Sequence, residues 1–344
     1  MEIELNLDTR LEDFLNQPKF AGIRDYVIYS PMGYHRHLYG KTLRELSEIG
    51  WNAESMLYGL QRLSEVSEDP RFYAPVYEGG EAGENSRVYA AFSENGEAGE
   101  DPRKKDVNVL FFPAKVRTGK PFFIIAAGGG YSGVCSIVEG YPVAARLNEL
   151  GFDAFVLTYR VGGKGVLPKP LEDLSAAVRL ILNRAELYGL RDTRYAVAGF
   201  SAGGNLTALF GTERHGYAKY GVPRPVALVP VYPVINMNTF SGKTDGDRAF
   251  CEIMYGENFT EADVAAHNVD ELAAGNYPPS YILCCKDDPV VPWRNSVLLK
   301  EKLDALGIPA VLEMCETGGH GFGEGRGTEA EGWIQRAAEF VSQI

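Results

Sequence analysis

Residues 194–210 read RYAVAGFSAGGNLTALF and combine two patterns in one short stretch. The first five residues are rich in apolar and aromatic side chains, as expected for a buried strand, and the apolar residues from 205 onward fall at helical spacing. A strand that turns into a helix within a few residues forces strained dihedrals on the corner residue, and Gly199 and Gly203 leave room for that crowding. The sequence therefore places Ser201 at a sharp strand-to-helix turn, with its hydroxyl held out at the end of a sheet.

The G-x-S-x-G pattern around Ser201 is informative only together with the elements that flank it. In a chain with 39 glycines the pattern arises readily by chance, and an ordinary Gly-rich turn is the alternative interpretation. The strand before it, the helix after it and suitable partners further along the chain favour a nucleophilic serine.

The length and charge of the chain limit the classes of protein to which it can belong. Its 344 residues are enough for one large α/β domain with an extension or for two modest domains. The formal net charge of -12 argues against a nucleic-acid or anionic-membrane surface, because phosphate binding needs clustered Lys and Arg. We therefore expect neither a nucleic acid nor a membrane as a partner.

The cysteines and the N-terminus favour a soluble cytoplasmic protein. The cysteines are odd in number and have no metal-like spacing, so we expect reduced, buried thiols and no metal site. They are Cys135, Cys251, Cys284, Cys285 and Cys315. The first residues, MEIELN, lack the basic start and apolar core of a signal peptide, and no apolar run approaches the length needed to span a bilayer.

Residues 1–77 show no alternation of strands and helices. Helical spacing appears over 43–49 and again over 54–66, which predicts a helical N-terminal extension packed on the main domain. His35 and His37 have the chemistry of metal ligands, but no third ligand is in view. A histidine pair at the surface or at an interface is the favoured interpretation.

The motif Gly-Glu-Ala-Gly-Glu occurs twice, at 80–84 and 96–100, on either side of an alternating run at 87–92. Two acidic turns that bracket a strand are the favoured interpretation. A calcium site is the alternative, and it is disfavoured because the carboxylates lack the close spacing of a binding loop.

From residue 107 onward apolar strand patterns alternate with helical patterns. We expect strands at 107–112, 121–126, 154–159, 194–198, 226–230, 280–285 and 310–314, and helices that include 143–150, 171–188, 295–306 and 333–341. Near-continuous apolar strands separated by helices predict the α/β class, with a mostly parallel central sheet flanked by helices and a site at the C-terminal ends of the strands. We assign 78–344 to this main domain, and the long stretch at about 234–277 predicts a cap-like insertion.

A serine hydroxyl needs a base to become a nucleophile, and the base needs an acid that fixes its tautomer. His320 lies in the loop GGHGF directly after the last predicted strand, where glycines let the backbone approach another loop. His215 lies a few turns along the helix that leaves the elbow, directed away from it, and the other histidines fall in the extension or the insertion. The sequence therefore favours His320 as the base, with a loop histidine of no catalytic role as the alternative.

The acid is expected in the loop KDDPVVP, which follows the strand at 280–285 and contains Asp287 and Asp288. The pattern Asp-x-x-Val-Pro followed by a helix resembles the acid loop of α/β-hydrolase esterases, and this resemblance implies Asp288. Asp287 stays open as the alternative; it is otherwise a surface or loop-capping carboxylate. The chain order Ser201, Asp288, His320 matches the order of that fold's triad.

A developing oxyanion needs fixed hydrogen-bond donors. The backbone N–H of Ala202, directly after the serine, is one expected donor. The run AGGGY at 127–131 resembles the His-Gly-Gly-Gly oxyanion motif of hormone-sensitive-lipase-like esterases, which implies the N–H groups of Gly129 and Gly130. Ala127 stands where that motif has histidine, so the bracing of the loop stays open. A phosphate loop is disfavoured because no Gly-Lys-Ser/Thr follows the glycines.

Taken together, residues from about 107 to 344 resemble bacterial acetyl-esterase and feruloyl-esterase-like carboxylesterases of the α/β-hydrolase fold, and YRV at 159–161 and PLED at 170–173 add to the likeness. The resemblance implies a serine carboxylic ester hydrolase for small-molecule short-chain acyl esters, among them acetyl or feruloyl esters of plant-derived carbohydrate, without a cofactor. Amide cleavage, as in peptidases and formamidases, is one alternative, and a catalytically silent binding protein of the same fold is another. The extension lies outside the likeness, and either caps the site or mediates homo-oligomerisation.

Four aromatic residues are neighbours of the expected catalytic residues in the sequence and are candidates for a substrate pocket. They are Tyr131, Phe200, Trp293 and Phe322. Simple packing of large aromatic side chains is the alternative interpretation of the same positions.

Overall fold

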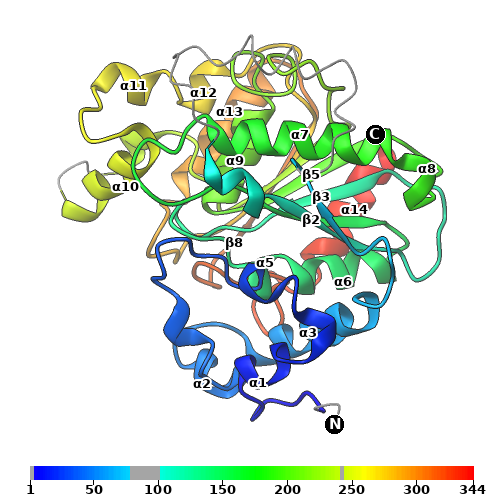
Figure 1. Cartoon of the computed structure of the whole chain (residues 1–344). Coiled ribbons are helices and arrows are strands. Elements are labelled where there is room, and N and C mark those ends of the chain that lie inside the picture. The colour runs from blue at the N-terminus through cyan, green and yellow to red at the C-terminus, as the bar shows by residue number, and fades with distance from the viewer. Residues whose placement is uncertain (1–3, 78–100, 241–243) are drawn as a thin grey trace.

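The structure is a computed structural model that describes residues 4–77, 101–240 and 244–344 (Figure 1). Its central feature is a sheet in which eight strands are described, in the order β1-β2-β4-β3-β5-β6-β7-β8. The strands are β1 Tyr73–Pro75, β2 Asn108–Phe112, β3 Phe122–Ala126, β4 Ala154–Thr158, β5 Tyr195–Phe200, β6 Ala227–Val231, β7 Ser280–Cys285 and β8 Ala310–Cys315. β1 and β2 pair antiparallel with their neighbours, and the pairs from β4 through β8 are parallel.

Burial explains why the strands read as near-continuous apolar runs. Every residue of β2 through β7 is buried, because both faces of the sheet are covered, whereas β8 at the edge is partly exposed. The predicted α/β class with a mostly parallel sheet is confirmed. The short strand β1 was not predicted, and the predicted strand at 87–92 and both Gly-Glu-Ala-Gly-Glu motifs lie outside the described residues.

Helices form a layer on each face of the sheet (Figure 1). One apolar cluster joins the sheet to α7 Lys169–Asn183, α9 Ala202–Phe210 and α13 Arg294–Ala305. A second cluster, on the opposite face, joins the sheet to α5 Ser136–Glu139, α6 Tyr141–Glu149 and α14 Trp333–Gln343. The predicted helix at 171–188 is divided at Arg184 into α7 and α8 Ala185–Tyr188.

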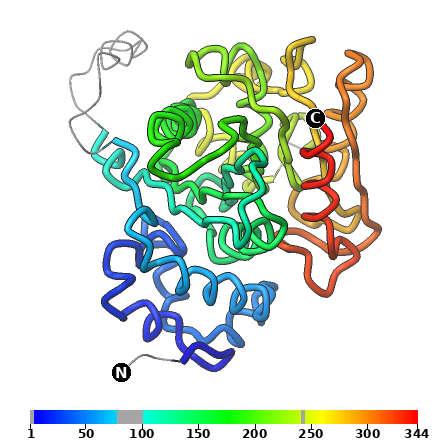
Figure 2. Tube along the Cα trace, turned by 90° about the vertical axis from the view of Figure 1, so that its right-hand side faces the viewer, coloured from blue at the N-terminus to red at the C-terminus, as the bar shows by residue number. Residues whose placement is uncertain are grey.

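The N-terminal segment lies below the sheet in both views (Figures 1 and 2). It contains α1 Leu11–Leu15, α2 Leu43–Ser47 and α3 Ala53–Val66, together with short 3-10 turns. The buried apolar side chains of these helices belong to the same cluster as those of α6 and α14. The segment is therefore continuous with the core of the sheet domain.

The long connection between β6 and β7 lies on the other side of the sheet (Figure 1). It contains α10 Asp245–Tyr255, α11 Glu261–Ala265 and α12 Val269–Leu272. The buried side chains of these helices belong to the cluster of α7 and α9.

All five cysteines are free thiols, and four of them are buried; Cys135 is half-buried. His35 packs against the backbone at Gly133, where a Cβ would lie 3.1 Å from its Nδ1 atom. Among the described residues no cluster of three or more metal-ligating side chains occurs. Within the described parts of the chain no helix has the length and apolar character that crossing a membrane requires.

Candidate active site

Ser201 occupies the corner between β5 and α9. Its φ of 52° and ψ of -116° lie in a sparsely populated region, so the surroundings must hold this conformation. A Cβ on Gly199 would lie 2.1 Å from the carbonyl oxygen of Gly203, and a Cβ on Gly203 would lie 2.1 Å from that of Ala126. Both glycines are therefore required for the tight strand-to-helix turn.

The structure brings His320 and Asp288 to Ser201. The Nε2 atom of His320 lies 2.9 Å from Ser201 Oγ, and its Nδ1 atom lies 2.7 Å from Asp288 Oδ2. The other carboxylate oxygen of Asp288 accepts the backbone N–H groups of Val290 and Val291 at 2.8 and 2.9 Å, and the carboxylate is fully buried. A carboxylate held in this way keeps the proton on Nδ1, which leaves Nε2 free to accept the serine proton.

Asp287, the alternative acid, points elsewhere. It accepts the backbone N–H groups of Gly318 and Gly319 at 3.2 and 2.8 Å. These bonds, that from Gly319 most strongly, hold the pKa of the Asp287 carboxyl below its usual value. Asp287 therefore braces the loop that carries His320, whereas Asp288 contacts the imidazole.

Three backbone N–H groups lie close to the serine in the fold, because Gly129 and Gly130 line the same cavity as Ser201 and Ala202 directly follows it. Those of Gly129, Gly130 and Ala202 have no acceptor among the described residues. The loop after β3 approaches Ser201 closely, since a Cβ on Gly128 would lie 2.9 Å from Ser201 Cβ. The site thus has donors of the kind that a developing oxyanion requires.

The structure shows how this loop is braced although Ala127 replaces a histidine. The buried carboxylate of Glu139 accepts the N–H of Gly128 at 2.6 Å and the hydroxyl of Tyr232 at 2.8 Å. Tyr159 donates its hydroxyl to the carbonyl of Ala127 at 2.6 Å. Burial raises the pKa of the Glu139 carboxyl, while the hydrogen bonds from Tyr232 and Gly128 act in the opposite direction. Sequence reasoning missed Glu139; the signal available was a single carboxylate in an otherwise apolar stretch.

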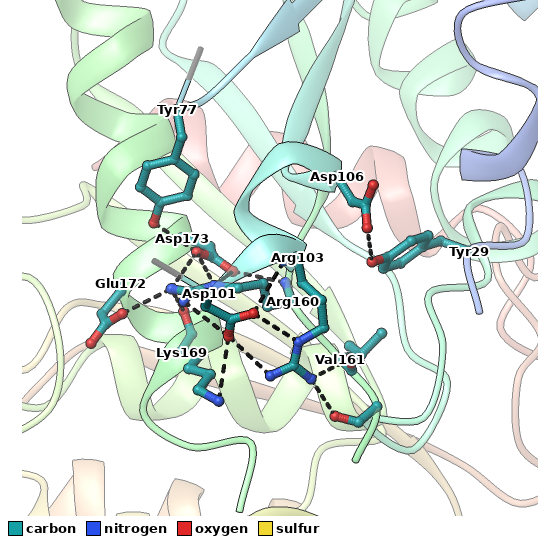
Figure 3. Close-up of polar contacts among 11 residues, drawn as sticks. Tyr29, Tyr77, Asp101, Arg103, Asp106, Arg160, Val161, Lys169, Glu172 and Asp173 are labelled. Carbon is teal, nitrogen blue, oxygen red and sulfur yellow. Dashed lines mark hydrogen bonds and ion pairs between the residues drawn. The ribbon is translucent and has the colours of Figure 1, made fainter. Parts of the chain in front are cut away.

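A polar network stabilises the next part of the loop from the side (Figure 3). Arg160, at the end of β4, pairs with the buried carboxylate of Asp173 at 2.8 Å. Arg103 donates to the carbonyl of Gly162 at 2.6 Å, and the N–H of Gly162 donates to the carbonyl of Tyr131 at 2.7 Å. The network therefore reaches the residue that directly follows the expected oxyanion donors.

None of the four aromatic residues that the sequence offered for a substrate pocket is among the described residues that line the cavity at Ser201. Tyr131 is fully buried and donates its hydroxyl to Asn205 at 2.8 Å. Phe200 packs against Trp333 in the cluster under the sheet, and Phe322 packs edge-on against Tyr232. Trp293 lies at the start of α13, beside the Arg294 guanidinium. Tyr131, Phe200 and Phe322 are therefore buried in packing contacts, whereas Trp293 is half-buried outside the cavity lining.

A cavity of about 430 Å³ opens at Ser201, His320, Gly129 and Gly130. Most of its side chains are apolar, and its aromatic rings come from Trp51, Phe240 and Phe250. The complete lining is Trp51, Gly129, Gly130, Cys135, Val138, Glu139, Ser201, Val234, Phe240, Gly246, Asp247, Phe250, Val290, Val291, His320 and Gly321. No sequence signal marked Trp51, which precedes α3 in the N-terminal segment.

The sheet order, the elbow and the loops at the ends of β3, β7 and β8 define the α/β-hydrolase fold. Within it, residues 109–303 match the BD-FAE family, so the chain belongs to that family. The match excludes both the N-terminal segment and the loop of His320.

Similar proteins include enzymes that act on xylan. The chain is 30% identical to endo-1,4-beta-xylanase B of Butyrivibrio fibrisolvens, over 61% of this chain and 34% of the relative. It is 27% identical to an acetylxylan esterase of Xylanibacter ruminicola, over 58% of this chain and 40% of the relative. It therefore spans well under half the length of these two relatives. The crystal structure of an acetyl ester-xyloside bifunctional hydrolase from Caldicellulosiruptor lactoaceticus has a TM-score of 0.57 and 29% identity, and covers 69% of this chain and 86% of that chain.

Proposed function

We propose that this protein is a serine carboxylesterase that hydrolyses short-chain acyl esters through an acyl-enzyme on Ser201. The observation that carries the proposal is the hydrogen-bonded series from Asp288 through His320 to Ser201, next to the N–H groups of Gly129, Gly130 and Ala202. The names of the acetylxylan esterase and the acetyl ester-xyloside hydrolase support it.

The reaction begins when Ser201 Oγ attacks the ester carbonyl carbon and His320 Nε2 takes the hydroxyl proton. The imidazolium is stabilised by the Asp288 carboxylate at 2.7 Å from Nδ1. The carbonyl oxygen becomes an oxyanion, which the three backbone N–H groups bind; loss of one such donor raises the barrier by about 3 kcal/mol. This catalytic triad and oxyanion hole need no metal or cofactor for the chemistry.

The second half of the reaction restores the enzyme. His320 returns its proton to the leaving alcohol as the carbon–oxygen bond breaks, and the acyl group stays on Ser201. A water molecule then attacks the acyl carbon while His320 accepts one of its protons. Collapse of this second intermediate releases the acid and gives the proton back to Ser201.

The proposed natural substrates are acetyl or feruloyl esters of plant-derived carbohydrate. Support comes from the relatives, whose names refer to xylan and to acetyl esters. The cavity beside Ser201 is within the range of about 300–1,000 Å³ that encloses a small ligand.

The proposal is tested by labelling the protein with a fluorophosphonate and by measuring p-nitrophenyl acetate hydrolysis. We expect labelling of the wild type and none of Ser201→Ala, whose kcat falls by about 10⁴-fold or more. Asp288→Asn is expected to lose roughly 10⁴-fold in kcat. Asp287→Asn is the matched control and should lose far less, because its carboxylate contacts only the backbone of the His320 loop.

A folded wild type that takes no label would overturn the proposal. Faster turnover of the matched acetanilide than of the acetate ester would assign amide cleavage instead.

A further inference from the structure

Trp51 belongs to the N-terminal segment but reaches the cavity at Ser201. It lies between α2 and α3, is half-buried, and packs against the cluster below the sheet. The family match begins at residue 109, so nothing in that match accounts for Trp51.

The backbone next to Trp51 is attached at two sides. Asn52 caps α3 by accepting the N–H of Ser55 at 2.9 Å, and its side-chain amide donates to the carbonyl of Arg326 at 3.0 Å. Ser55 donates its hydroxyl to the buried carboxylate of Glu324 at 2.7 Å. Glu324 and Arg326 directly follow the His320 loop. These hydrogen bonds therefore fix the position of the backbone beside Trp51 relative to the loop that carries the expected base.

The opposite wall of the cavity comes from the other face of the molecule. Phe240 and Phe250 of the β6–β7 connection pack against the upper apolar cluster, as does Val291. Trp51 and Val138 belong to the lower cluster. The cavity is thus an apolar slot. Its aromatic rings come from both sides of the sheet: Trp51 from the side of α6 and α14, and Phe240 and Phe250 from the side of α7 and α9.

The lining favours an apolar group over a polyol. Among the described lining residues the carboxylates are those of Glu139 and Asp247, and Glu139 is already engaged by Gly128 and Tyr232. The slot offers few polar partners for several hydroxyl groups, while its aromatic and branched side chains suit a flat or branched hydrocarbon group. Its volume exceeds what an acetyl group alone requires.

We infer that Trp51 is a specificity-determining residue: its indole forms the wall that holds an apolar group larger than methyl, attached to either the acyl or the alcohol side of the ester. This inference rests on the proposed esterase function, and among the proposed natural substrates it favours feruloyl esters, whose acyl group is flat and larger than methyl, over acetyl esters of carbohydrate. It makes the N-terminal segment a part of the substrate site.

The test compares Trp51→Ala and Trp51→Phe with Trp293→Ala, a matched control whose half-buried indole lies outside the cavity lining. The first series varies the acyl group, as p-nitrophenyl acetate, butyrate and hexanoate. The second keeps acetyl and varies the alcohol from methyl to phenyl and naphthyl. We expect Trp51→Ala to lower kcat/KM for the bulky members about tenfold or more relative to the smallest member of the responding series. Trp51→Phe should lose less, and Trp293→Ala should keep the wild-type ratio.

Each outcome distinguishes the inference from the proposed function. A folded wild type that hydrolyses no ester contradicts the proposed function. An active enzyme whose ratios are unchanged by Trp51→Ala in both series contradicts the role of Trp51. The series that responds identifies the side of the ester that the slot holds.

A binding measurement covers the case in which Trp51→Ala does not fold. In Ser201→Ala protein we expect the intrinsic fluorescence to change on titration with p-nitrophenyl hexanoate or with naphthyl acetate, and we expect no such change in the double variant Ser201→Ala/Trp51→Phe. An equal change with Trp51→Phe would overturn the inference.

Discussion

The N-terminal segment and the β6–β7 connection flank the same cavity from opposite faces of the sheet, but they are attached very differently (Figure 1). Helix α3 buries Met56, Leu60, Leu63 and Val66 against the core of α6. In contrast, α10 buries Cys251 and Met254, and α11 buries no residue. Helix α3 is therefore held by more buried apolar side chains than α10 and α11 are.

Backbone contacts reinforce this difference. Tyr29 and Val134 exchange two backbone hydrogen bonds of 3.0 and 2.8 Å, so the N-terminal segment is paired with the loop that contains the expected oxyanion donors. The Tyr29 hydroxyl also donates to Asp106 at 2.9 Å (Figure 3). A segment outside the family match is therefore built into the site, and we expect its loss to affect folding as well as specificity.

The largest expected effect is on global stability. Leu60→Ala should lower the free energy of unfolding by about 2–5 kcal/mol, because the side chain is fully buried and leaves a cavity. Leu272→Ala, in the half-buried last residue of α12, is the matched change on the other flank and should cost less. Urea unfolding followed by circular dichroism measures both. Equal losses of unfolding free energy in Leu60→Ala and Leu272→Ala would contradict the difference in packing between α3 and the β6–β7 connection.

An intermediate effect on stability is expected when one glycine is replaced by alanine in α3 and one in α10. A Cβ on Gly59 of α3 would lie 2.7 Å from Pro142, so Gly59→Ala should cost about 1–3 kcal/mol by forcing α3 away from α6. At Gly246 of α10 the nearest atom would be 3.8 Å away, and Gly246→Ala should stabilise by about 0.4–1 kcal/mol. Thermal unfolding of the two variants should shift Tm in opposite directions. A neutral Gly59→Ala would show that the α3–α6 contact is loose.

The last effect concerns pH and the β6–β7 connection. His215 stacks on His267 with ring centroids 4.5 Å apart, and its Nε2–H donates to the carbonyl of Ala266 at 2.8 Å. Burial, opposed by the hydrogen bond to Ala266 and helped by nearby His267, Arg214 and Lys219, lowers the pKa of His215 to about 4. Below the ordinary pKa of about 6.5 the unfolded chain takes up a proton that folded His215 does not. Stability is therefore fully present above this value and is lost as pH falls toward 4.

His215→Gln should flatten that loss of Tm between pH 6.5 and 4.5, whereas His37→Gln, at an exposed position of the N-terminal segment, should leave it unchanged. If Tm depends on pH in the same way in the wild type, His215→Gln and His37→Gln, burial of His215 does not cause the loss of stability at low pH.

Much of the fold was predictable because strand and helix periodicity survive in the sequence. β7 begins and ends at the predicted residues, and β3 and α14 agree within two residues. β1 was missed because three residues carry too little pattern. The site was predictable where backbone geometry restricts residue type, as at Gly199 and Gly203 around Ser201.

Other parts of the site had no local signal. Glu139 and Tyr232 brace the loop after β3 through contacts between distant segments. The four aromatic residues were chosen by their proximity in sequence, but the direction of a ring depends on the backbone beneath it, and none of the four lines the cavity at Ser201.

The chain's apolar runs and glycines determine the sheet, the elbow and the order of the catalytic loops, because each is a local requirement of backbone conformation and burial. The choice of Asp288 over Asp287 was already implied by the Asp-x-x-Val-Pro resemblance. The bracing by Glu139 and the presence of Trp51 at the cavity of Ser201 depend on how separate segments pack. Such contacts are long-range, so periodicity and spacing along the chain carry no record of them.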